Sequence, residues 1–194
     1  MMTRLNNAVP FSGLAALLLV ASLSASAAGV HQHGLAQAAV VLEEQNLTVT
    51  FRAPLMDILG TTQPPGDAAA RVRYAQRLAQ ITPPVPASRA DCKVVSALQT
   101  TVEQLFPEGH NHRHDPAHEN HEAHEHDEHD DHHDEHQDVE AEWSFICQQP
   151  DALNVISLPF LNTFSSLTTE VVLLLPSGQN ALRLAPGNPR IPLE

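Results

Sequence analysis

A segment rich in histidine and acidic residues interrupts the chain between His110 and His136. Its 27 residues, HNHRHDPAHENHEAHEHDEHDDHHDEH, include eleven histidines, ten aspartates or glutamates and one arginine. This composition offers almost nothing to bury and many like charges to keep apart. We therefore predict that residues 108–138 form a long disordered loop, and that the fold is built from the residues on either side.

The same segment is suited to binding metal ions. Neutral imidazole nitrogens bind zinc, nickel, copper and cobalt, and the interleaved carboxylates supply further ligands. Many equivalent ligand sets favour several exchangeable sites, as in capture or buffering, over one catalytic site. We expect several Zn²⁺ ions, with Ni²⁺ or Cu²⁺ able to compete. The candidate ligands are His110, His112, His114, His118, His121, His124, His126, His129, His132, His133 and His136.

Two other interpretations of the segment are weaker. A solvated acidic linker would need no histidine, yet here histidine alternates with acidic residues throughout. Calcium prefers oxygen ligands, and the spacing does not match an EF-hand loop.

A second pair of histidines, His31 and His33, precedes the first predicted strand in the sequence Gly-Val-His-Gln-His-Gly. They could be ordinary surface residues, but beside a histidine-rich segment we interpret them as a second metal site. If the chain were cleaved after Ala28, His31 would become its third residue. A free amine with histidine third binds square-planar Cu²⁺ or Ni²⁺.

The first 28 residues have the pattern of a secretory signal peptide. Arg4 is followed by a short apolar stretch and by small residues that offer cleavage after Ala27 or Ala28. We expect an exported, periplasmic protein in which residues 29–194 form one metal-binding domain. The apolar stretch is too short for a membrane span, so we expect no stable membrane insertion.

The charge pattern excludes nucleic acid as a partner. The formal net charge is −13, and ten acidic residues against one arginine place −9 of it between His110 and His136, leaving −4 elsewhere. Such a surface attracts cations and repels phosphate backbones. No H-E-x-x-H, G-x-S-x-G or phosphate-loop motif is present, so we do not expect an enzyme.

The two cysteines, Cys92 and Cys147, favour a disulfide in an exported chain. This bond would enclose the histidine-rich segment and hold both of its ends on the folded domain. Metal binding by the two thiols is the alternative, although neither cysteine has a neighbouring partner.

Hydrophobic patterns predict a strand-rich α+β fold, a sheet or sandwich with one main helix. Residues 35–43 and 47–53 suggest a hairpin, with Leu47, Val49 and Phe51 on its buried face. A helix is expected over residues 68–80, capped by Asp67, with an apolar stripe at Ala68, Val72, Ala75 and Ala79. This helix is expected to pack on the sheet.

Two strands are predicted to flank the histidine-rich segment. Residues 92–105 would bury Cys92, Val94, Leu98 and Val102, and residues 139–147 alternate clearly between apolar and polar. We expect an antiparallel pair with the histidine-rich loop at its tip. The apolar run at residues 170–175 suggests a central strand.

A series of short motifs runs through the chain in a fixed order: His31-Gln32-His33-Gly34, Leu47-Thr48-Val49, Ala53-Pro54, Leu59-Gly60, Cys92, the histidine-rich tract, Phe145-Ile146-Cys147, Pro176-Ser177-Gly178-Gln179 and Pro189-Arg190. This order resembles the ZrgA type of periplasmic zinc-uptake protein over nearly the whole mature chain. One departure is Thr61-Thr62-Gln63, where family members often have Phe-Glu-His, so a ligand expected there is absent.

The resemblance implies an α/β-sandwich-like domain that binds zinc and supports high-affinity uptake beside an ABC importer or its solute-binding protein. The alternative function is a periplasmic buffer or detoxification protein for Zn, Ni or Cu with no transport partner. A third possibility, that the chain is itself the solute-binding protein, conflicts with its length, because that fold needs two lobes.

Overall fold

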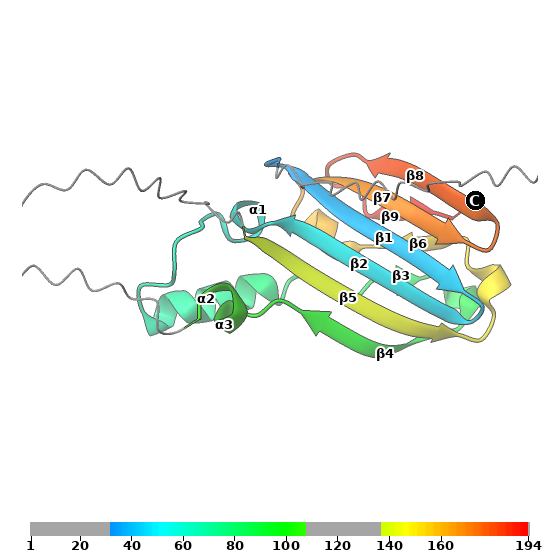
Figure 1. Cartoon of the computed structure of the whole chain (residues 1–194), viewed down its shortest axis with the longest axis horizontal. Coiled ribbons are helices and arrows are strands. Elements are labelled where there is room, and N and C mark those ends of the chain that lie inside the picture. Colours follow the sequence, from blue (N-terminus) through cyan, green and yellow to red (C-terminus); the bar gives the residue numbers. More distant parts are fainter. Residues whose placement is uncertain (1–31, 108–136, 194) are drawn as a thin grey trace, which may run out of the picture. The chain divides into compact units, whose positions relative to one another are not determined.

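A six-stranded twisted sheet with the strand order β4-β5-β2-β1-β7-β8 forms the main layer of the fold (Figure 1). The computed structural model describes residues 32–107 and 137–193. Neighbouring strands are antiparallel except β1 and β7, which are parallel. The strands are β1 (Leu35–Glu43), β2 (Asn46–Pro54), β4 (Cys92–Gln99), β5 (Asp138–Cys147), β7 (Thr168–Leu175) and β8 (Gly178–Leu184).

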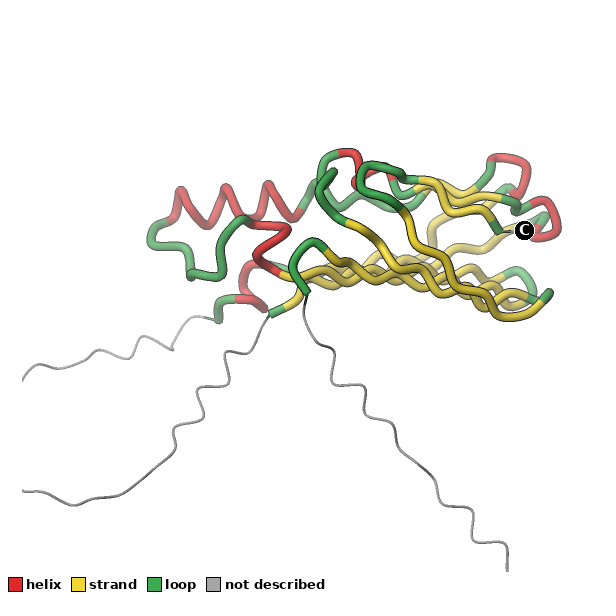
Figure 2. Tube along the Cα trace, turned by 90° about the horizontal axis from the view of Figure 1, so that it is seen from above, coloured by secondary structure: helices red, strands yellow, loops and turns green. Residues whose placement is uncertain are grey.

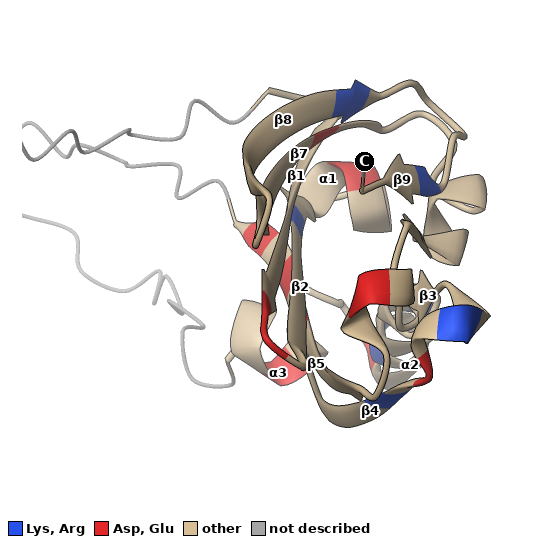
Figure 3. Cartoon of the chain, turned by 90° about the vertical axis from the view of Figure 1, so that its right-hand side faces the viewer, with Lys and Arg blue, Asp and Glu red and all other residues tan. Residues whose placement is uncertain are grey.

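A second, three-stranded sheet faces the inner side of the large sheet (Figure 3). It consists of β3 (Val85–Pro86), β6 (Val155–Ser157) and β9 (Arg190–Pro192), and short 3₁₀ turns lie at Ser88–Ala90, Pro150–Ala152 and Pro159–Asn162. The helices are α1 (Leu55–Leu59), α2 (Ala68–Leu78) and α3 (Val102–Leu105). The strand-rich α+β prediction is therefore confirmed.

The core lies between the two sheets and is formed by alternating strand residues. Leu47, Val49 and Phe51 of β2 are buried, as predicted. The Phe160 ring lies 4.8 Å from that of Phe51 and 6.0 Å from that of Trp143, measured between ring centroids. In β5 every second residue is buried, which confirms the period of two in that strand: Val139, Ala141, Trp143, Phe145 and Cys147.

Strands β4 and β5 form the predicted antiparallel pair, and Cys92 and Cys147 form a disulfide at one end of it. At the other end Gln99 pairs with Ala141, after which the chain continues through α3. The histidine-rich residues 108–136 lie outside the described residues. The two positions that flank them, 107 and 137, are at the end of the pair opposite the disulfide.

The prediction for residues 92–105 was wrong in part. Strand β4 ends at Gln99, and Val102 belongs to a helix that Thr101 begins with a capping box. Val94 and Leu98 are exposed rather than buried, at 49% and 63%. Strand β4 lies at the edge of the sheet with a register shift between Val94 and Ser96, and the residues between its two ends are exposed on both faces, so no other layer packs on them.

Helix α2 is confirmed, and the Asp67 side chain accepts a hydrogen bond from the Ala70 N–H at 2.6 Å. Its predicted apolar stripe was wrong, because Val72 is 54% exposed whereas Ala70 and Leu78 are buried. The helix is rotated so that its larger side chains, Tyr74 and Leu78, face inward. It lies beyond one end of the large sheet and contacts α1 and α3, rather than covering a sheet face (Figures 1 and 2).

Strand β7 lies inside the sheet, as its apolar sequence suggested, but only one of its faces is covered. Val171 and Leu173 are buried, whereas Val172 and Leu174 are about 40% exposed on the outer side. Among the helices of the described residues, none is long and apolar enough to span a membrane.

Candidate functional site

His33 is held in a tight turn at the start of β1. The Leu35 N–H donates to the Gln32 carbonyl at 3.1 Å, and the Gly34 carbonyl accepts from the Thr168 N–H at 2.8 Å. Gly34 has a φ of +77°, a backbone conformation that residues other than glycine rarely adopt. The sequence His-Gly thus fixes the backbone of this histidine, and its side chain remains 69% exposed.

Asp57 of α1 faces this turn. Its Oδ2 atom accepts a hydrogen bond from the Gly34 N–H at 2.8 Å, and its Oδ1 atom lies 3.9 Å from Nδ1 of His33. The latter distance is too long for a hydrogen bond. The Asp57 side chain is only 15% exposed, so a carboxylate that is largely shielded from solvent lies beside an exposed imidazole.

The same helix contacts the chain where it leaves the histidine-rich segment. The Leu55 N–H donates to the Gln137 carbonyl at 2.9 Å, and Nε2 of Gln137 donates to the Leu105 carbonyl at 3.0 Å. Gln137 therefore connects α1 with α3, the last helix before the segment. His33 and both flanks of residues 108–136 gather at one end of the sheet.

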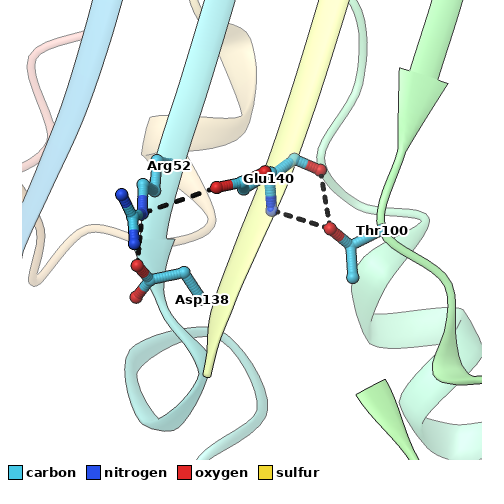
Figure 4. Close-up of polar contacts among 4 residues, drawn as sticks. All are labelled: Arg52, Thr100, Asp138 and Glu140. Atoms are coloured by element: carbon cyan, nitrogen blue, oxygen red, sulfur yellow. Dashed lines mark hydrogen bonds and ion pairs between the residues drawn. The ribbon is translucent and has the colours of Figure 1, made fainter. Parts of the chain in front are cut away.

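The first residues of β5 are fixed by a polar cluster (Figure 4). Arg52 of β2 forms ion pairs with Asp138 and, at 3.6 Å, with Glu140. The Thr100 hydroxyl donates to the Glu140 carbonyl at 3.1 Å and accepts from the Glu140 N–H at 2.9 Å. This cluster ties β5 to β2 on one side and to the end of β4 on the other.

A hollow of about 880 Å³ lies on the outer face of the large sheet, beside the polar cluster. Ala39, Thr50 and Val172 line its floor, and Arg52 and Glu140 contribute to its border. No histidine or cysteine lines this hollow, so nothing marks it as a site for a zinc ion.

Of the thirteen candidate ligands, His33 alone lies within the described residues. The structure places it beside Asp57, whereas His31 and the eleven histidines between 110 and 136 lie outside the described residues. Residues 32–107 and 137–193 contain no group of three or more metal-binding side chains. The sequence analysis missed Asp57, because it lies 24 residues after His33 and only the fold brings them together.

A search of family models matched residues 30–193 to the ZrgA family zinc uptake protein. The chain belongs to this family. Among curated proteins no match was found. Membership confirms the resemblance drawn from the motifs and gives this ZrgA family member a role in zinc uptake. The family and the disulfide together indicate an exported protein.

Proposed function

We propose that this ZrgA family member is a periplasmic zinc-binding accessory protein. It captures Zn²⁺ through the histidines between 110 and 136 and supports high-affinity uptake beside an ABC importer or its solute-binding protein. Residues 1–28 are its signal peptide, and it performs no catalytic step. The observation that carries the proposal is the family match over residues 30–193, which assigns a zinc-uptake role to a chain with eleven clustered histidines.

Coordination chemistry supports capture by the segment. A Zn²⁺ ion takes four ligands, and imidazole and carboxylate groups recur here every one to four residues. Several ions can therefore be bound and exchanged without a rigid site. Ni²⁺ and Cu²⁺ also bind imidazole and would compete. The excess of negative charge should speed the capture of cations, and added salt should reduce that effect.

The fold supports a division of labour between the segment and the domain that carries it. The core is completed by apolar residues from both sheets, and a disulfide closes one end of the β4–β5 pair. Among the described residues, the buried ones are apolar apart from Thr169. We therefore infer that apolar packing and the disulfide, rather than zinc, stabilise the domain that carries the segment.

The first test is a calorimetric Zn²⁺ titration of the chain from residue 29 onward, with and without replacement of residues 110–136 by a Gly/Ser linker of equal length. We expect the intact chain to bind several ions and the replaced chain to lose most of them. An unchanged number of bound ions would refute capture by the segment. Both chains should unfold at the same denaturant concentration, which controls for damage to the domain.

Binding should also depend on pH in a defined direction. Imidazole binds metal only when neutral, and its ordinary pKa is about 6.5, so affinity should fall steeply as pH drops from 7.5 to 5. Equal affinity at the two pH values would favour the carboxylates as the main ligands. In cells, expression induced by zinc starvation would fit uptake, whereas induction by zinc excess would point to a buffer or detoxification protein.

A further inference from the structure

We propose that His33 and Asp57 are two ligands of a separate zinc site on the folded domain. The inference rests on the proposed function, because it takes Zn²⁺ as the ion that the protein handles. It adds a ligand, Asp57, that lies on α1 and not in either histidine-rich stretch. It also places zinc on the described domain itself, at the end of the sheet from which residues 108–136 depart.

The geometry of the pair is close to that of a zinc site. Zinc lies about 2.0–2.2 Å from histidine nitrogen and carboxylate oxygen, so two such ligands of a tetrahedral ion are about 3.3 Å apart. Nδ1 of His33 and Oδ1 of Asp57 are 3.9 Å apart. A small rotation of the exposed His33 side chain would close the difference without moving the backbone.

The two oxygens of Asp57 have different surroundings. Oδ2 accepts the Gly34 N–H, which orients the carboxylate, whereas Oδ1 points toward the imidazole. Within residues 32–107 and 137–193, no Lys or Arg forms an ion pair with Asp57. By contrast the similarly shielded Asp138 is paired with Arg52. Asp57 is therefore a largely shielded anion whose charge a bound cation would neutralise.

The position of the pair suggests what such a site does. Asp57 lies two residues after Leu55, whose N–H binds the Gln137 carbonyl at the boundary of the histidine-rich segment. Gln137, the first described residue after the histidine-rich segment, therefore contacts the same short helix that carries Asp57. Two protein ligands leave coordination positions open for water or for a group of a receiving partner, so the site would hold zinc during handover.

The pair can be tested in the chain from residue 29 onward, with ¹³C-labelled histidine and Zn²⁺ alone as the probe. The variant His33→Asn identifies the NMR signal of His33. We expect Zn²⁺ to shift this signal in the parent chain, and we expect Asp57→Asn to require about tenfold more Zn²⁺ for the same shift. Asp151→Asn, in the turn after β5, is the matched control and should behave like the parent.

Asp57→Asn keeps an oxygen that can accept the Gly34 N–H, so the turn is retained while the charge is lost. If the His33 signal does not move while other histidine signals do, the inference fails and zinc capture by the segment stands. If Asp57→Asn matches the parent, Asp57 is not a ligand. If no histidine signal moves, the proposed function fails as well. Amide spectra of each variant verify the fold.

Discussion

The two ends of the β4–β5 pair are held by different kinds of interaction. At one end Cys92 and Cys147 are covalently bonded, and Cys147 is fully buried. At the other end the chain is fastened by the Gln137 hydrogen bonds and by the ion pair of Arg52 with Asp138. We call the end with the disulfide the closed end, and the end with exposed polar groups near His33 the open end.

This difference separates stability from metal handling. A disulfide holds its two cysteines together whether or not ions are bound to the chain between them. Hydrogen bonds and ion pairs with an exposed member, such as the half-exposed Arg52, are individually weaker than a covalent bond and can be exchanged with water. The closed end therefore maintains the fold, and under the proposed function the open end would accept and release ions with little cost to the stability of the fold. Three of the four predictions below test this separation, and one concerns the interior of the sheet.

The largest effect is expected at the closed end. Replacing both Cys92 and Cys147 by Ala removes a bond between residues 55 apart in sequence. The chain-entropy model then gives a loss of about 4 kcal/mol in the free energy of unfolding. Denaturant unfolding followed by Trp143 fluorescence measures it. The number of zinc ions bound at low denaturant should stay the same, and a lower number would show that the two ends are coupled.

A smaller effect is expected at the open end from Gly34→Ala. The added Cβ would meet the Ser166 carbonyl oxygen at 3.9 Å, an ordinary contact, so the cost comes from the φ of +77°. A residue with a Cβ atom costs about 1–2 kcal/mol when its backbone is held in this left-handed region of φ. We expect that loss in the free energy of unfolding, together with weaker zinc binding at His33.

The matched control for Gly34→Ala is Gly66→Ala, where no positive φ is required and a Cβ meets nothing within 4 Å. This second variant should be neutral or slightly stabilising. Equal destabilisation by the two variants would contradict the assigned role of the Gly34 turn.

The comparison also explains which features the sequence could predict. Strands β2 and β5 were predicted well because each has one face against the core, which imposes an apolar–polar alternation. The same argument failed for Val94 and Leu98, since hydrophobic residues on an edge strand can remain exposed. The sequence does contain a helix start for α3, because Thr101 and Gln104 form its capping box. This start was missed because the apolar pattern of the preceding strand was extended through it to residue 105.

Only one of the two residues of the candidate site, His33, could be predicted from the sequence. His33 stands out because histidine is rare outside the tract, so composition alone identifies it. Asp57 is an ordinary acidic residue of a five-residue helix, and only the pairing of β1 with β2 and the turn into α1 bring it to His33. A partner fixed by tertiary structure leaves no local pattern in the sequence.

A third prediction concerns the interior of the sheet. The Thr169 hydroxyl on β7 is fully buried, and it has no hydrogen-bond partner among the described residues. In Thr169→Val the valine side chain has nearly the shape of threonine but carries a methyl group in place of the hydroxyl. We therefore expect a gain of about 1 kcal/mol in the free energy of unfolding. Thr50→Val, on the outer face of β2, should change little. A loss of stability in Thr169→Val would mean that its hydroxyl has a partner.

The smallest effect is expected beside the open end, at Glu103 in the first turn of α3. A hydrogen bond from its own backbone N–H, followed by the contact with Arg71, lowers the pKa of Glu103 below its ordinary value of 4.5. A carboxyl whose pKa is lower in the folded state stabilises the fold above the pKa of the unfolded chain, and this contribution is lost as pH falls through the folded value.

Unfolding midpoints of the parent and Glu103→Gln should therefore differ slightly at pH 7. The difference should disappear as pH falls below the lowered folded pKa of Glu103, because the carboxyl is then neutral in both the folded and the unfolded chain. Because the side chain is 69% exposed, high salt should narrow the difference at pH 7. A difference that persists in acid strong enough to protonate the carboxyl in both states would show that Glu103 acts through packing rather than charge. The contribution of α3 to the stability of the open end would then come from packing and not from the charge of Glu103.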